Sequence, residues 1–231
     1  MKIAVIPARG GSKRIPRKNL KVFSGLPIIA WSIRAAIESN CFERIIVSTD
    51  DDEIAQVAVL FGAEAPFKRP AELSDDYTGT IPVIAHAIEW MQAQGQAVSE
   101  VCCIYATAPF VRANDLIQGL ETLKTSVADY AFAVTSYGFP VQRAIRITSE
   151  MRTEMFYPEY LSARSQDLPE AWHDAGQFYW GKSQAWLRGR PMFGLNSLAV
   201  PLPRYRVQDI DTLEDWERAE WMFKAMEALG E

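Results

Sequence analysis

Apolar runs and amphipathic patterns alternate along the first 136 residues of the chain. Short apolar or β-branched runs predict strands at 2–8, 44–50, 100–107 and 130–136. Apolar positions at helical spacing predict helices at 27–39, 51–62, 80–94 and 114–124. Strands joined by helices of this length imply right-handed crossovers and a mostly parallel sheet covered on both faces. The pattern therefore predicts an α/β protein with a three-layer α/β/α, Rossmann-like architecture.

The pattern changes after Pro140, where shorter runs replace the regular alternation. Segments 143–148, 152–158 and 176–182 are predicted to be strands of a hairpin-rich insertion, with the loop 164–175 among them. The parallel pattern resumes with predicted strands at 197–203 and 204–211, followed by a final helix at about 213–229. The whole chain, 1–231, is therefore expected to be one domain that carries an inserted subdomain at 140–182.

Aromatic side chains are concentrated in the predicted 140–182 subdomain. They are Phe156, Tyr157, Tyr160, Trp172, Phe178, Tyr179 and Trp180. This density favours a surface that binds a partner. A local hydrophobic core explains it equally well, and the sequence leaves the two interpretations open.

Charge is distributed very unevenly along the chain. Residues 9–21 carry six cations and no acid, whereas the chain as a whole has a net charge of −5. Cations confined to one loop favour a small polyanion, because a nucleic-acid binder spreads them over a face that follows the backbone. No apolar run approaches the roughly 20 residues that span a bilayer. Three cysteines do not predict a disulfide framework, so a cytoplasmic protein without a membrane partner is expected.

The basic loop begins where the first predicted strand ends, at Pro7. Ligands of parallel sheets bind at this carboxyl edge. Gly10 and Gly11 allow the backbone to approach a phosphate closely, and Arg9 and Lys13 are suited to neutralise a triphosphate. The loop lacks both the G-x-G-x-x-G and the G-x-x-x-x-G-K-[ST] patterns. A solvated loop without a ligand is the alternative, and it is disfavoured because concentrated cations repel one another unless an anion is present.

The sequence "IPARGGSKRIPRKN" resembles the signature of the CMP-sialic acid synthetase family, the cytidylyltransferases that activate nonulosonic acids with CTP. The segments "RIIVSTDDDEIA", "RPAEL", "ATAP", "RSQDLPEAWHDAGQFYWG" and "DIDTLEDW" carry the resemblance further along the chain. It implies a nucleotidyltransferase fold that transfers CMP from CTP to the anomeric hydroxyl of a nine-carbon 2-keto sugar acid. The segment "HDAGQFYWG" looks most like that of the pseudaminic acid cytidylyltransferases. A CMP-N-acetylneuraminic acid or CMP-legionaminic acid synthetase is the alternative.

The resemblance also implies roles for individual residues. The positions matched to nucleotide binding are Ala8, Arg9, Gly10, Ser12, Lys13, Asn19, Arg69 and Thr80. The residues assigned to the sugar are Tyr105, Arg164, Gln166, His173 and Gln177, of which Tyr105 departs from the glutamine that sialic acid enzymes often have at its position. The segment that contains the last four is expected to pack against a second subunit, so a homodimer is expected. Arg69 as a surface ion-pair partner and Thr80 as an N-cap remain alternatives. His173 is either oriented by the neighbouring Asp174 carboxylate or part of a solvated pair.

Asp209 and Asp211 are the expected metal ligands and, with Arg9 and Lys13, the expected catalytic residues. They end the predicted strand 204–211, where a spacing of two places both carboxylates on one face. Mg²⁺ (or Mn²⁺) takes one or two carboxylates and completes its shell with water and phosphate oxygens. Helix capping by Asp211 or Thr212 is the alternative, although it leaves Asp209 unexplained.

Two further classes of function remain compatible with the pattern. One is a glycosyltransferase, since such folds also use an Asp-x-Asp pair, although usually in the middle of the chain. The other is a nucleotide sensor that binds without catalysis. His86, by contrast, lies within an amphipathic helical pattern and is expected to be a packed or edge histidine.

Overall fold

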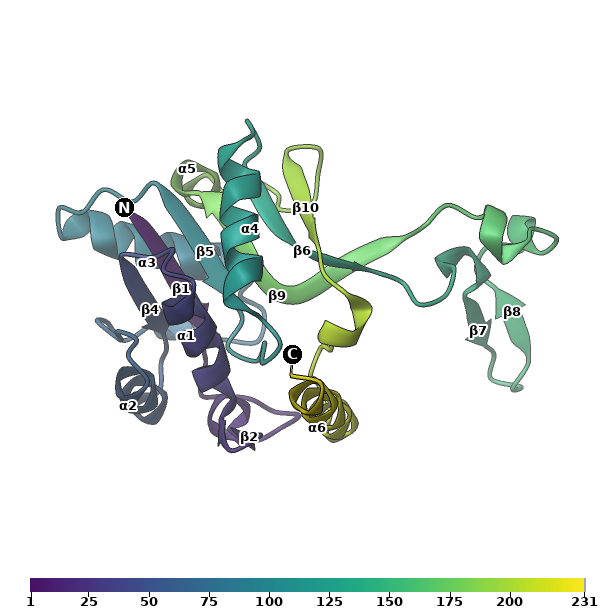
Figure 1. Cartoon of the computed structure of the whole chain (residues 1–231), viewed down its shortest axis with the longest axis horizontal. Coiled ribbons are helices and arrows are strands. Elements are labelled where there is room, and N and C mark those ends of the chain that lie inside the picture. The colour runs from purple at the N-terminus through teal and green to yellow at the C-terminus, as the bar shows by residue number, and fades with distance from the viewer. Residues whose placement is uncertain (231) are drawn as a thin grey trace.

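The computed structural model describes residues 1–230, which are built around a six-stranded sheet (Figure 1). The strand order is β10-β6-β9-β5-β1-β4, and every neighbouring pair is parallel except the two that involve β9. The bounds are β1 (Lys2–Pro7), β4 (Arg44–Ser48), β5 (Glu100–Ile104), β6 (Tyr130–Ser136), β9 (Trp172–Lys182) and β10 (Ser197–Pro201). The mostly parallel sheet expected from the alternation is confirmed.

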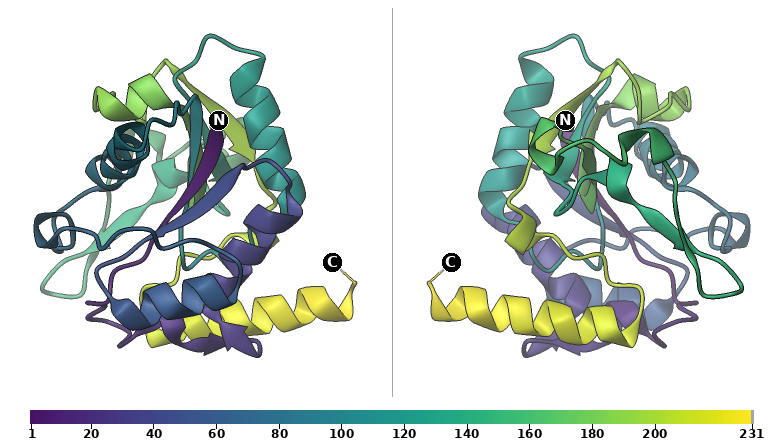
Figure 2. Two further views of the ribbon diagram at one scale, coloured as in Figure 1. Left: turned by 90° about the vertical axis from the view of Figure 1, so that its left-hand side faces the viewer. Right: turned by 90° about the vertical axis from the view of Figure 1, so that its right-hand side faces the viewer.

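Helices cover both faces of this sheet, as Figures 1 and 2 show. One face carries α1 (Ile28–Glu38), α2 (Asp52–Leu60) and α4 (Ala113–Lys124), and the other carries α3 (Thr80–Ala93) and α5 (Ser183–Leu187). Successive residues of β1 point to opposite sides. Ile6 packs in the cluster of α1 and α4, whereas Val5 packs in the cluster of α3 and α5. The three-layer α/β/α architecture is confirmed.

The last helix, α6 (Leu213–Ala228), lies across one edge of the body (Figure 2). It packs against the small hairpin formed by β2 (Val22–Phe23) and β3 (Leu26–Pro27), which follows the basic loop. The Phe23 ring centroid lies 5.5 Å from that of Trp216 and 5.3 Å from that of Phe223. Edge-on aromatic contacts of this kind stabilise a defined geometry. The C-terminal helix therefore holds the end of the basic loop in place.

An arm extends from the body between β6 and β9 (Figure 1). It contains a two-stranded antiparallel ribbon, β7 (Ile145–Ile147) and β8 (Thr153–Met155). The short 3₁₀ helices of the chain are η1 (Lys18–Leu20), η2 (Ala71–Leu73), η3 (Val141–Arg143), η4 (Pro158–Tyr160), η5 (Ser165–Asp167) and η6 (Arg204–Arg206). Three of them, η3 to η5, lie in the arm.

One strand that was predicted for the insertion belongs to the main sheet instead. Residues 176–182 form the buried half of β9, which pairs antiparallel with both β5 and β6. Phe178, Tyr179 and Trp180 are therefore core residues and not part of a partner surface. A short apolar run has the same pattern in a hairpin and in the centre of a sheet, so the sequence pattern did not separate the two.

The predicted strand 204–211 is also wrong. Its first residues form η6, and the described backbone that follows has no regular structure as far as the start of α6. The segment is anchored by a buried ion pair, in which the Arg206 guanidinium donates to both Asp115 carboxylate oxygens at 2.6 and 3.0 Å. This side-chain contact joins the segment to α4, while its described residues form no strand.

The three cysteines are buried free thiols, and Cys102 and Cys103 lie in β5 as expected. Over residues 1–230, no helix combines the length and the apolar character needed to cross a membrane.

Candidate functional site

The basic loop lines a cavity of about 500 Å³ at the carboxyl edge of the sheet. It follows β1 directly, where parallel strands expose the ends that bind ligands in such folds. Residues predicted from three separate parts of the chain line this cavity together: Arg9, Ser12, Lys13, Asn19, Tyr105 and Asp211. The tertiary structure thus brings together half of the predicted nucleotide-binding residues, one of the predicted sugar-binding residues and one of the two aspartates.

Carboxylates from elsewhere in the chain pair with the cations of this loop. Asp76 pairs with Arg9 at 2.6 Å and also with Lys13. The remaining pairs are Arg14–Asp211 at 2.9 Å, Lys18–Asp211 at 3.6 Å, and Arg17 with both Asp51 and Glu53. The expectation that such a loop needs an external anion to relieve repulsion is therefore wrong, because the protein supplies its own. The cavity and its position at the carboxyl edge of the sheet, and not the unrelieved charge, favour a bound polyanion.

At Gly10 the basic loop contacts the residues that follow strand β4. Its N–H donates to Asp50 Oδ1 at 3.0 Å, so this group is directed at a carboxylate. A Cβ atom at this position would lie 2.7 Å from Asp51 Oδ2, a distance at which a side chain does not fit. Asn19 is buried and donates from Nδ2 to the Arg9 carbonyl at 2.9 Å. Gly10 and Asn19 therefore act by shaping the loop.

Arg69 and Thr80 line a second cavity of about 350 Å³, which adjoins the first at Tyr105. Arg69 is buried, with its guanidinium 3.8 Å from Asp50 and hydrogen-bonded to Ser74, and desolvation lowers its pKa. It is not the surface ion-pair partner that was the alternative. Thr80 is not the N-cap of α3, since Gly79 occupies that position.

Tyr105 connects these cavities to a group of hydroxyls. Its phenolic oxygen lies 3.2 Å from Thr80 Oγ1, and its ring packs 5.1 Å from that of Tyr179. Burial raises the pKa of Tyr105, so the hydroxyl remains protonated at neutral pH. Tyr179 donates in turn to the Asp174 carboxylate at 2.6 Å. The site therefore offers neutral hydroxyls next to the cationic loop.

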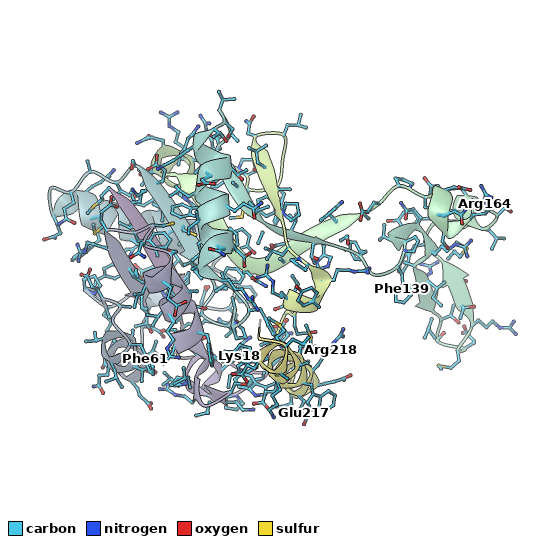
Figure 3. The ribbon with its side chains drawn as sticks, in the orientation of Figure 1. Lys18, Phe61, Phe139, Arg164, Glu217 and Arg218 are labelled. Atoms are coloured by element: carbon cyan, nitrogen blue, oxygen red, sulfur yellow. The ribbon has the colours of Figure 1, made fainter. Side chains whose placement is uncertain are left out.

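The other predicted sugar residues do not reach this cavity in one chain. Arg164 lies on the arm and pairs with Asp167 at 2.6 Å, and Gln166 lies beside it in η5. Figure 3 shows Arg164 at the far end of the arm, whereas Lys18 lies in the body next to α6. Gln177 is buried in the core and donates to the Arg206 carbonyl at 2.6 Å.

His173 differs from its expected setting. It lies in strand β9 and not in a loop, and its Nδ1 is 2.8 Å from the backbone carbonyl of Asp174. The Asp174 carboxylate is engaged by Tyr179 and by the N–H of Gly176. The imidazole is therefore not oriented by that carboxylate. His86 lies in α3 and packs against the Phe67 ring, as expected.

Asp209 and Asp211 flank the buried Ile210 at the entrance to α6. Asp211 lines the larger cavity, whereas Asp209 lies outside its lining. Desolvation and the nearby charge of Asp211 raise the pKa of Asp209. Thr212 is the N-cap of α6 and forms a capping box with Asp215, so the capping alternative for Asp211 is wrong.

Asp76 is a residue of the candidate site that the sequence pattern did not indicate. It lies in the turn between η2 and α3, lines both cavities, and contacts Arg9 and Lys13. Asp76 lies in an acidic turn segment like others in the chain. Its position between the predicted residues Arg69 and Thr80 is the feature of the sequence that could have indicated it.

Comparisons with known proteins agree on one family. A family model described as "Cytidylyltransferase" matches residues 3–154. The chain is 46% identical over 222 residues to a pseudaminic acid cytidylyltransferase of Campylobacter jejuni subsp. jejuni serotype O:23/36 (strain 81-176), covering 96% of each chain. It is 34% identical to N-acylneuraminate cytidylyltransferase A of Danio rerio, over 94% of this chain and 49% of the other. A solved CMP:2-keto-3-deoxy-manno-octonic acid synthetase complexed with CTP matches with a TM-score of 0.70 at 15% identity, covering 97% and 98% of the two chains, and supports the fold.

Proposed function

The chain belongs to the cytidylyltransferase family, and we propose that it transfers CMP from CTP to a nonulosonic acid, with pseudaminic acid as the preferred sugar. The observation that carries this proposal is the 46% identity over 96% of both chains to an enzyme named for that sugar. The cavity with its basic loop at the carboxyl edge of the sheet is the geometry that a nucleoside triphosphate requires.

In this reaction the sugar hydroxyl loses its proton to solvent, and its oxygen forms a bond to the α-phosphorus of CTP. The bond from that phosphorus to the oxygen of the departing pyrophosphate breaks. Such chemistry depends on positioning and on neutralising charge, and it needs no protein nucleophile. Arg9 and Lys13 lie on the cavity wall and are placed to bind the phosphates that leave. Asn19 supports them indirectly through the Arg9 carbonyl.

The residues present fit a divalent cation, which we propose to be Mg²⁺ (or Mn²⁺). Two carboxylates two residues apart, one of them on the cavity wall, are hard oxygen donors of the kind that Mg²⁺ takes. No group of three or more His, Cys, Asp or Glu within residues 1–230 is arranged to hold a metal. Asp211, on the cavity wall, would hold the ion together with substrate oxygens, and Asp209 would support it from outside the cavity lining. When bound, the ion supplies positive charge to the phosphates.

The arm supports a homodimer as the functional form. It carries exposed apolar side chains that find no partner in the body: Phe139, Ile145, Ile147, Met151, Phe156 and Leu161. Phe139 is 86% exposed, and clustered apolar exposure of this kind marks interaction sites. Arg164 and Gln166 lie away from the cavity of their own chain. In a homodimer the arm could bring them to the cavity of the second copy.

The double variant Ile147→Asp, Phe156→Asp should shift the chain from dimer to monomer in light scattering at micromolar concentration. The reason is that two charges would be buried in an apolar contact. Val127→Asp is the matched control, since Val127 is 98% exposed on the loop before β6, away from the arm. A wild-type chain that is monomeric and fully active at assay concentration would refute the dimer.

Pseudaminic acid should be used with a kcat/KM at least about tenfold higher than N-acetylneuraminic acid. A site that hydrogen-bonds one sugar rejects a sugar with different substituents and stereochemistry, because the site's own polar groups are left unpaired. The measurement is pyrophosphate release with CTP and Mg²⁺ for each sugar. Similar values would overturn the sugar assignment. Binding of CTP without pyrophosphate release from any of the sugars would instead favour the sensor alternative, and activity with a CMP-sugar donor would favour the glycosyltransferase.

A further inference from the structure

The turn 74–79 places one carboxylate against both cations that the proposed function assigns to phosphates. One Asp76 oxygen accepts from Arg9 Nη1 at 2.6 Å, and the other pairs with Lys13. The backbone carbonyl of the neighbouring Asp75 accepts from the same Arg9 nitrogen at 2.8 Å. The two cations hold the pKa of Asp76 below its usual range, so its carboxylate is anionic at neutral pH. Asp76 thus occupies the contacts that a phosphate group would make.

Asp76 also stands between the two cavities. It lines both the larger one, next to the basic loop, and the smaller one, next to Arg69 and Thr80. The cavities share Arg9 and Tyr105 as well. A ligand long enough to occupy both must therefore replace the Asp76–Arg9 contact.

The turn is built so that these contacts can be exchanged without unfolding it. Asp75 Oδ1 accepts from the N–H groups of Tyr77 at 3.0 Å and Thr78 at 2.7 Å, and Thr78 Oγ1 donates to the Glu72 carbonyl at 3.1 Å. These bonds join residues 72–78 to one another and involve neither Arg9 nor Lys13. Tyr77 is 94% exposed and so adds little packing. Within the part of the chain described, the polar contacts between residues 75–78 and the basic loop are those made to Arg9 and Lys13.

We propose that Asp76 is an internal competitor for the phosphates of the nucleotide, which holds Arg9 and Lys13 until a triphosphate displaces it and the 74–79 turn moves away. The proposal rests on the proposed function only in naming CTP as the natural ligand. Exchange favours an anion that carries several charges, because one carboxylate must be released from two cations at once. The Asp76 contact with Arg9 and Lys13 therefore favours binding of polyphosphates over singly charged anions. Its release when the nucleotide binds would join the two cavities.

Asp76→Asn should tighten CTP binding about two- to tenfold in isothermal titration calorimetry, with inorganic tripolyphosphate as a second probe. The substitution keeps the shape and removes the competing charge. This range lies within the limit set by two partly exposed ion pairs, each of which contributes at most about fivefold. In the Lys13→Ala background the same substitution should have about twofold effect or less, since one of its two partners is gone.

Glu72→Gln is the matched control. It removes the same charge from the same segment, and Glu72 is exposed and makes no ion pair with Arg9 or Lys13. Equal tightening in this variant would attribute the effect to net charge and overturn the proposal. Unchanged binding in Asp76→Asn would also overturn the proposal. Weaker binding would overturn it as well, because it would show that Asp76 contacts the ligand directly.

The two probes separate this inference from the proposed function. If tripolyphosphate binding depends on Asp76 but CTP does not bind, the proposed function is refuted and the competitor role of Asp76 is supported. If CTP binds and pyrophosphate is released with no dependence on Asp76, the proposed function is supported and the competitor role of Asp76 is refuted. If neither probe binds the wild-type chain, both fail.

Discussion

Asp211→Asn should lower kcat by on the order of 10²-fold, because the variant would hold less well the cation that neutralises the reacting phosphates, and loss of one electrostatic stabiliser typically has an effect of this size. Asp211 lines the cavity and is reached by Arg14 and Lys18 from the basic loop. Asparagine keeps its shape and removes its charge. The variant should also need more Mg²⁺ for half-maximal activity, because a neutral amide is a poorer ligand. Pyrophosphate release measured across a Mg²⁺ titration gives both quantities.

Asp209→Asn should have a smaller effect of the same kind, since Asp209 lies outside the cavity lining. Glu214→Gln is the matched control, because Glu214 is an exposed acid in the first turn of α6. The melting temperature of Asp211→Asn should stay close to that of the wild type, as exposed ion pairs contribute at most about 1 kcal/mol. Near-normal turnover of both aspartate variants at limiting Mg²⁺ would place the metal elsewhere.

Lys13→Ala and Arg9→Ala should each lower kcat/KM for CTP by about one to two decades. A charge-assisted contact to a phosphate contributes roughly 1.5–3 kcal/mol, which corresponds to this range in rate. Both side chains line the cavity. The loss should lie near the lower limit, because each substitution also releases a contact with Asp76 that the nucleotide must otherwise break. Initial rates at varied CTP and saturating sugar measure it.

The sugar dependence distinguishes this role from a general disturbance of the site. At saturating CTP, KM for the sugar should change less than about threefold in either variant, a difference within the usual context dependence of one weak contact. Lys21→Ala controls for removing a cation from the same stretch, because Lys21 packs over Trp216 and not on the cavity wall. Unchanged CTP kinetics in both Lys13→Ala and Arg9→Ala would contradict the assignment of the loop to the triphosphate.

Much of the architecture was predictable because its causes are local. The 3.6-residue spacing of apolar positions in α1 and the acids that open α2 are properties of short segments, and each helix formed where its pattern indicated. The position of the basic loop followed from the end of the first strand alone. The three-layer fold then followed from the alternation of strand and helix.

The wrong predictions concern pairing, which is not local. The run at 176–182 and the run at 204–211 both have the composition of strands, yet one is the antiparallel centre of the sheet and the other is no strand. Which partner a strand finds depends on contacts across the whole chain. In the second case the segment contacts α4 through the Arg206–Asp115 ion pair, which joins residues 91 apart.

The sequence by itself determined that a concentrated set of cations would meet the carboxyl edge of a parallel sheet, because charge and periodicity are written in consecutive residues. Only the tertiary structure decided what those cations contact. Arg9 reaches an aspartate 67 residues away, and Lys18 reaches a carbonyl 192 residues away. Many acids in the chain were equally available to them, and the folded path of the backbone selected Asp76 and Asp211. The physical reason is that an ion pair depends on distance in space, which a sequence does not contain until the sheet has brought its segments together.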